Sequence, residues 1–277
     1  MSNLQTRVIT ALVLGALVVG TLLTGSSMLW AAVVLAFCLA AVWEGQRLCS
    51  QTSLAARAVG WAGALSLLGG LWLITFWRPV ALAYLPVVLL YVVALFWLAV
   101  APVQLGKHVL PPASIFTRTM LVLLIGAAWL SAVLLQRLGV AFLVAVVVLT
   151  VVADVAGYFV GRAFGRHKLA PAISPGKTRE GAAGGVTAAA LWSAAAASYL
   201  GLAQSPVQVA IALVAGAALG CCAVMGDLWE SLLKRQAGVK DSSQLLPGHG
   251  GVLDRIDAQL AVLPTATLLI SLVKPLW

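Results

Sequence analysis

Long apolar runs separated by short polar interruptions follow one another along nearly the whole chain. A run of about 18 residues or more can cross the roughly 30 Å hydrocarbon core of a membrane as a helix. The alternation of apolar and polar residues typical of a membrane β-barrel is not seen. The chain is therefore predicted to be an all-α, polytopic helical membrane protein with about nine transmembrane helices. The predicted spans are 8–25, 28–43, 58–77, 80–103, 119–136, 138–160, 181–203, 207–226 and 259–276.

Composition supports the membrane class and leaves one question at the N-terminus. Hydrophobic residues make up 62% of the 277 residues, charged residues only 9%, and the mean hydropathy is +1.05. The first apolar run, after Arg7, is either a signal peptide or a retained span. It is longer than a usual signal core and another apolar run follows at once, which favours retention. The four cysteines show no CxxC spacing, so neither disulfides nor a zinc site are expected.

The basic residues predict the orientation. If nine helices alternate across the membrane, all of the 17 Lys and Arg residues except Arg78, Arg137 and Lys274 lie on the side of the N-terminus. Loops rich in Lys and Arg stay in the cytoplasm. We therefore expect a multi-pass protein of the inner (cytoplasmic) membrane whose charged loops face the cytoplasm. The net charge of +9 then reflects topology and contact with anionic lipid, and no nucleic-acid partner is expected.

Two segments hold almost all of the acidic residues. Seven of the eight Asp and Glu residues lie in 154–180 and 227–257, and Glu44 is the exception. A solvated loop with internal ion pairs is the alternative, but such a concentration of carboxylates favours a functional site. The predicted organisation is an N-terminal helical region, 1–150, and a C-terminal catalytic region, 151–277, with cytoplasmic loops at 161–180 and 227–258.

The second charged segment begins with a helical pattern. Asp227 follows the eighth predicted span, and Ser231 and Lys234 come four and seven residues later, on the same helix face. Arg235 adds a cation beside Lys234. We expect a charged helix face where this span leaves the membrane.

A glycine turn follows this helix face. His249-Gly250-Gly251 predicts a turn whose backbone can approach a ligand closely, and His249 itself is equally a general base, a phosphate donor or a turn residue. A helix is expected to restart near Val252, which places Asp254 and Asp257 on its first turns. Carboxylates and cations would then face one another across the turn. Hard carboxylate oxygens suit Mg²⁺, and Lys and Arg suit phosphate, so the pattern indicates phosphoryl or nucleotidyl transfer.

The first charged segment adds a carboxylate inside the membrane. Asp154 lies eight residues before Arg162, and an ionisable residue at that depth is a candidate functional residue by default. Gly157 and Gly161 form a GxxxG pattern that predicts a helix-packing face. The string ending in Gly176-Lys177-Thr178 lacks the glycine and the preceding strand of a nucleotide-binding P-loop. Ser174, Lys177 and Thr178 remain candidates for phosphate contacts.

The polar residues of 231–257 resemble the signature of the phosphatidate cytidylyltransferases, also called CDP-diacylglycerol synthases. The matching positions are Ser231, Lys234-Arg235, Lys240-Asp241, His249-Gly250-Gly251 and Asp254-Arg255-Ile256-Asp257. Segment 154–181 resembles an upstream block of the same family, with Gly157 where alanine is expected. The two segments cover about a fifth of the chain.

The resemblance implies a Mg²⁺-dependent transfer of CMP from CTP to phosphatidic acid at the bilayer surface. It places metal ligands at Asp227 and Asp254, with Asp257 close by. It implies that phosphate charge is met by basic and polar side chains: Lys234, Arg235, Lys240 and Arg255, helped by Lys168, Ser174 and Lys177. The complete set of expected site residues adds Asp154, Thr178, Ser231, Asp241 and His249.

Two alternatives remain open. A CTP-dependent enzyme acting on an isoprenoid lipid would share the chemistry and differ in the product. A transporter with Asp154 in its pathway would spread charges through several spans, whereas here they gather in two segments on one side. The sequence leaves the oligomeric state undefined, with a homodimer among the alternatives.

Overall fold

The structure, a computed structural model, describes residues 3–49, 54–77, 82, 84–110 and 114–274. Arg78 and the predicted span ends at 80–81 and 275–276 lie outside these residues. The helices are α1 (Asn3–Leu23), α2 (Ser27–Leu48), α3 (Leu54–Trp77), α4 (Leu85–Leu95), the π-helical turn η2 (Phe96–Val100), α5 (Ala101–Lys107), α6 (Ile115–Leu138), α7 (Val140–Phe164), α8 (Arg179–Tyr199), α9 (Pro206–Gln236), α10 (Leu253–Ile256) and α11 (Gln259–Ser271).

The all-α membrane class is confirmed, whereas the count of nine spans is not. Each predicted span coincides with a helix, but within the described residues seven helices are long and apolar enough to cross a membrane. These are α1, α2, α3, the continuous run of α4, η2 and α5, then α6, α7 and α9. Two predicted spans fall on helices that do not meet this criterion: α8, whose sequence is rich in Gly, Ala, Ser and Thr, and α11, which has 13 residues.

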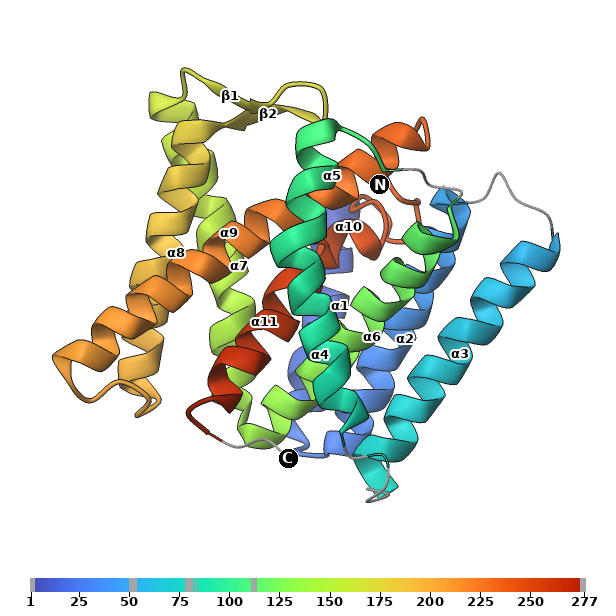
Figure 1. The fold of residues 1–277 in the computed structure, drawn as a ribbon, viewed down its shortest axis with the longest axis horizontal. Coiled ribbons are helices and arrows are strands. Elements are labelled where there is room, and N and C mark those ends of the chain that lie inside the picture. The colour runs from blue at the N-terminus through green and yellow to red at the C-terminus, as the bar shows by residue number, and fades with distance from the viewer. Residues whose placement is uncertain (1–2, 50–53, 78–81, 83, 111–113, 275–277) are drawn as a thin grey trace.

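The central helix of the bundle is α6, which packs against α2, α3, α4, α7 and α11 (Figure 1). Every residue from 124 to 136 is buried, so all faces of this part of α6 are covered by other helices. Two buried tryptophans connect it reciprocally to α2: Trp30 Nε1 donates to the Ala132 carbonyl and Trp129 Nε1 to the Ala31 carbonyl, each at 3.0 Å. In an apolar core such indole N–H groups need a partner, so these bonds fix how the two helices face each other.

A second group of helices, α7, α8 and α9, packs through small residues. A Cβ atom on Gly181 would lie 2.7 Å from the Gly157 carbonyl oxygen, and one on Gly185 would lie 2.7 Å from the Ala153 carbonyl oxygen. The predicted packing face at Gly157 and Gly161 is therefore confirmed, and its partner is α8. The small side chains let the two backbones approach closely, as at other helix contacts in membranes.

We expect Gly185→Ala to lower the stability of this helix pair. The added methyl group must push the α7 backbone away, and overpacking of this kind costs about 1–3 kcal/mol. The control is Gly70→Ala in α3, where a Cβ would meet no atom within 4 Å. The measurement is the thermal unfolding midpoint of both variants in one detergent. Equal midpoints for the two variants would contradict the packing argument.

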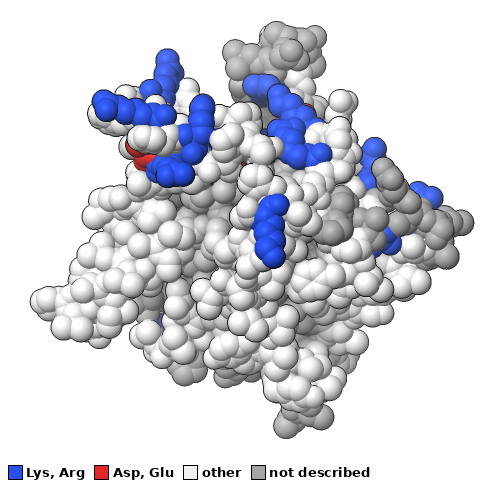
Figure 2. All heavy atoms as spheres, turned by 45° about the horizontal axis from the view of Figure 1, so that its top comes forward, with Lys and Arg blue, Asp and Glu red and all other residues white. Residues whose placement is uncertain are grey.

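The polar segments gather at one end of the bundle, which lies at the top of Figure 1. Figure 2 shows Lys and Arg side chains clustered over this end. Residues 161–180 contain a feature that the sequence did not predict, a β-hairpin formed by the antiparallel strands β1 (Lys168–Ala170) and β2 (Ser174–Thr178). The hairpin leads directly into α8, whose first turn is capped by the Thr178 hydroxyl.

The second loop begins later than predicted. Helix α9 continues for ten residues beyond Gly226, so Asp227 and Ser231 lie within a helix, and the loop proper occupies 237–252. Lys234 and Arg235 in the last turn of α9 favour this extension, because cations are stabilising at the negative end of a helix dipole. The predicted restart near Val252 is confirmed as the single-turn helix α10.

Candidate active site

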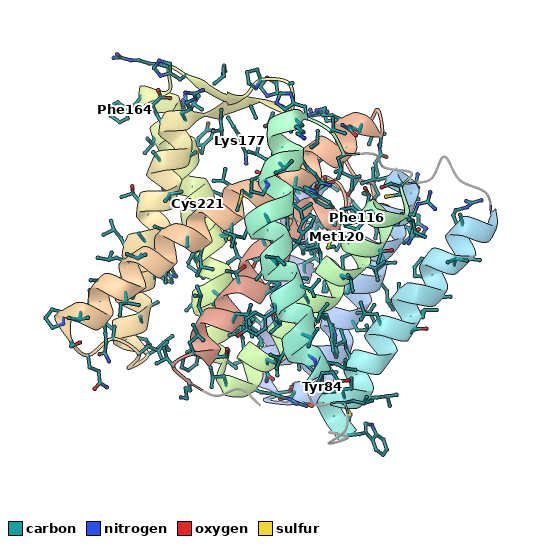
Figure 3. All side chains as sticks on the ribbon, in the orientation of Figure 1. Tyr84, Phe116, Met120, Phe164, Lys177 and Cys221 are labelled. Atoms are coloured by element: carbon teal, nitrogen blue, oxygen red, sulfur yellow. The ribbon has the colours of Figure 1, made fainter. Side chains whose placement is uncertain are left out.

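An ion pair joins the hairpin to α9. The Lys177 ammonium on β2 is in direct contact with the Asp227 carboxylate on α9. Ser231, one helical turn further along, donates its hydroxyl to Asp227 Oδ1 at 3.3 Å. Figure 3 shows Lys177 beneath the hairpin, at the charged end of the bundle. The two segments that the sequence separates by 50 residues therefore meet at one carboxylate.

Two further carboxylates surround this ion pair. Asp257, between α10 and α11, is half-buried, and its Oδ1 accepts the Ala258 N–H at 2.7 Å. Burial first, and then the negative charge of Asp227, raise the pKa of the Asp257 carboxyl well above its usual value, with a smaller contribution from Asp154. Lys177 acts in the opposite direction. The negative charges of Asp154, Asp227 and Asp257 thus act on one another close to the Lys177 ammonium, an arrangement that favours binding of additional positive charge.

Asp254 has a different surrounding. Its Oδ1 accepts Lys234 Nζ at 2.7 Å, and its Oδ2 accepts the Gly251 N–H at 2.8 Å and the Ser242 N–H and hydroxyl at 3.0 Å each. Burial alone would raise the pKa of Asp254, but the Lys234 and Gly251 hydrogen bonds hold it below its usual value. Lys234 also pairs with Glu230 at 2.6 Å. The predicted meeting of carboxylate and cation across the glycine turn is confirmed.

The turn itself depends on glycine. Gly248 and Gly250 have φ values of +75° and +80°, a left-handed conformation that side-chain-bearing residues rarely adopt. Between them, the His249 N–H donates to the Leu246 carbonyl at 2.8 Å, and the His249 carbonyl accepts Arg255 Nε at 3.0 Å. His249 Nδ1 is buried and has no hydrogen-bond partner among the described residues. These backbone contacts support the interpretation of His249 as a turn residue. They leave open a role as a general base or as a phosphate donor.

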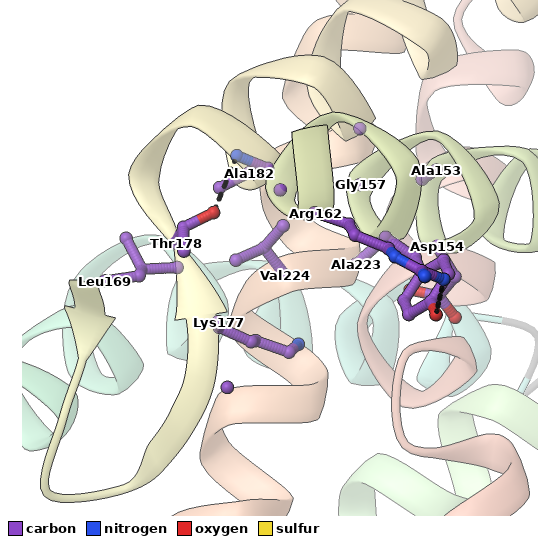
Figure 4. A pocket seen from close by; sticks show the side chains of 15 residues that line it. Ala153, Asp154, Gly157, Arg162, Leu169, Lys177, Thr178, Ala182, Ala223 and Val224 are labelled. Carbon is purple, nitrogen blue, oxygen red and sulfur yellow. Dashed lines mark hydrogen bonds between the residues drawn. The ribbon is translucent and has the colours of Figure 1, made fainter. Parts of the chain in front are cut away.

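A cavity of about 510 Å³ opens beside the ion pair. It lies between α7, the hairpin, α8 and α9, and Asp154, Lys177 and Thr178 are among its lining residues (Figure 4). Tyr158 and Arg162 on α7 line the same cavity, and the Arg162 guanidinium donates to the Tyr158 hydroxyl at 3.2 Å. A membrane-embedded carboxylate and a hairpin cation therefore share one space.

The other expected site residues differ in the contacts that they make. Thr178 and Arg235 already have structural partners: the Thr178 hydroxyl caps α8, and Arg235 Nε donates to the Ile173 carbonyl at 3.3 Å. Ser231 likewise positions Asp227. Exposed or half-exposed at the charged end are Lys168, Ser174, Lys240 and Asp241; Arg255 is also exposed, although its Nε donates to the His249 carbonyl. Their predicted contacts with substrate remain predictions.

Two acidic residues that were not expected in the site belong to it. Glu230 was counted among the charged residues of its segment but given no role, and it is the second partner of Lys234. Glu44 lies outside both charged segments, yet its buried carboxylate accepts hydrogen bonds from the loop around the glycine turn. Its signal in the sequence was its isolation as a single acid in a long apolar helix.

The donor chemistry of the site fits Mg²⁺. Within the described part of the chain, no three His, Cys, Asp or Glu side chains form a ready metal-binding group. Mg²⁺, however, is usually held by one or two carboxylates together with substrate phosphates. Asp227 and Asp257 supply carboxylate oxygens whose mutual repulsion a cation would relieve. Both Asp254 oxygens already accept hydrogen bonds, so binding of a metal there would require Lys234 or Ser242 to move.

These features define a polytopic membrane protein with a cluster of paired carboxylates and ammonium groups at one end of its bundle. A sequence model of the cytidylyltransferase family matches residues 5–273. A Pseudomonas aeruginosa protein named phosphatidate cytidylyltransferase is 36% identical over 272 residues, which cover 94% of both chains. A Brucella suis protein of that name is 36% identical over 274 residues, covering 94% of this chain and 91% of its own. A Bacillus subtilis protein of that name is 44% identical over 119 residues, 43% of both chains. The chain belongs to the cytidylyltransferase family of nucleotidyltransferase enzymes.

Proposed function

We propose that the protein is a phosphatidate cytidylyltransferase of the bacterial inner membrane, with its active site facing the cytoplasm. A phosphate oxygen of phosphatidic acid attacks the α-phosphorus of CTP, the bond between the α-phosphorus and the bridging oxygen breaks, and pyrophosphate leaves. The products are CDP-diacylglycerol and pyrophosphate. Full-length similarity to relatives named for this activity supports the proposal.

The observation that carries the proposal is the pair of carboxylate–ammonium contacts at one end of the bundle. Lys177 meets Asp227, and Lys234 meets Asp254. CTP approaches from water and phosphatidic acid stays in the bilayer, so both reach a site only where the charged groups lie at the membrane surface. This transfer needs positioning and charge neutralisation and requires no nucleophile from the protein. The lipid phosphate itself therefore serves as the nucleophile.

We assign the side chains according to what each can contribute. Lys177 and Lys234 exchange their carboxylate partners for phosphate oxygens as substrate enters, since ammonium groups serve as mobile point charges. Lys240 and Arg255, both exposed, meet the outer phosphates of CTP. Asp227 and either Asp254 or Asp257 would hold Mg²⁺, which supplies neutralisation of triphosphate charge when bound. Asp154, in the cavity wall, helps to orient Lys177.

The test uses purified protein in detergent with CTP labelled in the α-phosphate, phosphatidic acid and Mg²⁺. We expect label in the lipid phase, pyrophosphate release in equal amount, and loss of both when a chelator removes the metal. Transfer only when an isoprenoid phosphate replaces phosphatidic acid would keep the chemistry and change the substrate. No transfer to either lipid would refute the proposal and favour a transporter with Asp154 in its pathway.

A further inference from the structure

A buried carboxylate on a distant helix holds the loop that carries Asp254. Glu44, near the end of α2, has no exposed surface. Its Oε1 accepts the Ser243 hydroxyl at 2.6 Å and the Val252 N–H at 2.9 Å. Its Oε2 accepts the Leu253 N–H at 2.6 Å and the Ser242 hydroxyl at 3.0 Å. Four donor groups from one loop therefore surround a single carboxylate.

This arrangement fixes both ends of the segment 242–253. Burial of a carboxylate is costly unless hydrogen bonds replace its hydration, and here every replacement comes from this segment. The Val252 and Leu253 N–H groups belong to the start of α10, where a helix leaves its first N–H groups without intrahelical partners. Glu44 thus satisfies the first turn of the helix that presents Asp254.

The two serines differ in what they reach. The Ser242 hydroxyl lies 3.0 Å from Glu44 Oε2 and 3.0 Å from Asp254 Oδ2, while the Ser242 N–H also points to Asp254. A hydroxyl has one proton, so the Ser242 hydroxyl lies between the two carboxylates and donates to either Glu44 or Asp254 at any one time. The Ser243 hydroxyl contacts Glu44 and donates nothing to Asp254.

The same contacts account for the second glycine of the His-Gly-Gly turn. A Cβ atom on Gly251 would lie 2.6 Å from Glu44 Oε1 and would also overlap the Ser242 hydroxyl. The Gly251 N–H donates to Asp254 at 2.8 Å. Any larger residue at 251 would separate Glu44 from the loop and displace a donor of Asp254.

We propose that Glu44 is a positioning residue of the cytidylyltransferase site, which acts through Ser242 and the start of α10 to hold the Asp254 carboxylate. The inference rests on the proposed function for its effect on turnover. Helix α2 thereby takes part in the catalytic end of the molecule, although the sequence of α2 contains none of the signature residues of 231–257.

The test compares Ser242→Ala with Ser243→Ala. Both variants remove one hydroxyl from Glu44, so similar decreases of the unfolding midpoint are expected. Turnover should separate them: Ser242→Ala is expected to lower kcat about tenfold or more, the scale of one hydrogen bond to a charged group, with KM for CTP little changed. Ser243→Ala should keep kcat near the wild-type value. Glu44→Gln, which keeps the side-chain shape, should lower kcat at least as far as Ser242→Ala. In the double variant Glu44→Gln/Ser242→Ala, the fold-decrease in kcat should be smaller than the product of the two single fold-decreases.

Amide hydrogen exchange of residues 251–253 gives a readout independent of turnover. Faster exchange in Glu44→Gln and Ser242→Ala than in Ser243→Ala is expected. Equal kcat losses and equal exchange in the two serine variants would overturn the inference and leave Glu44 as a general stabiliser of the fold. A wild-type protein without turnover on phosphatidic acid would refute the proposed function, while the exchange comparison would still decide whether Glu44 holds this loop.

Discussion

Replacement of Asp254 by asparagine is expected to abolish measurable turnover and to leave the bundle folded. The substitution keeps the size of the side chain and removes its negative charge, so Lys234 loses one counter-ion and the site loses a carboxylate. Loss of one preorganised electrostatic group from an active site lowers kcat by about 10²–10³. Lys234 keeps Glu230 at 2.6 Å, so its ammonium is not left alone in a half-buried position. The measurement is initial rate with saturating CTP and phosphatidic acid, beside the thermal unfolding midpoint.

Glu180→Gln provides the matched acid-to-amide control. Glu180 lies in the first turn of α8, where its carboxylate accepts the Arg166 and His167 N–H groups and contacts His167 Nδ1 at 2.6 Å. It holds the start of the hairpin, and among the described residues it makes no hydrogen bond or ion pair with Asp227 or Asp254. Turnover of the same order as the wild type is expected. Asp254→Asn with normal kcat and normal Mg²⁺ dependence would refute the role of Asp254.

The pattern of apolar runs was sufficient to predict the membrane class and the position of each main helix, because a bilayer imposes helix length directly on sequence. The charged face of α9, the turn at 249–251 and the restart at Val252 were also predictable, since each depends on residues that are neighbours in the chain. The predicted loop nevertheless began at residue 227, well before the end of α9 at Gln236, because the polar last turns of α9 resemble a loop by hydropathy. The helix dipole and side-chain pairing keep these turns helical.

Contacts between distant segments could not be predicted from the sequence. The pairing of Lys177 with Asp227 depends on a hairpin whose strands have three and five residues, too short for a periodic signal. The partners of Glu44 lie about 200 residues further along the chain. An isolated acid in an apolar helix indicates a function, but its partner is defined only by the packing of α2 beside the loop.

The pairing of Lys177 with Asp227 leads to the second large expected effect. Lys177→Gln should lower kcat/KM for CTP by about a hundredfold or more, the scale of removing one charge-stabilising group from an active site. Without the ammonium, the carboxylates of Asp154, Asp227 and Asp257 repel one another more strongly, and the hairpin loses its ion pair with α9. The triphosphate then enters a site with more negative charge.

Arg179→Gln removes a cation two residues further along, at an exposed position at the start of α8. It changes the net charge of the protein by the same amount, so a general electrostatic attraction of CTP to the basic surface predicts equal losses in the two variants. A role of Lys177 at the carboxylate cluster predicts a large loss in Lys177→Gln alone, and that loss should persist at high salt because a half-buried charge is screened less than an exposed one. Rates for both variants at two ionic strengths therefore distinguish a specific contact from surface charge. Equal losses that disappear in salt would show that Lys177 acts only as one of the surface cations, and would remove it from the site.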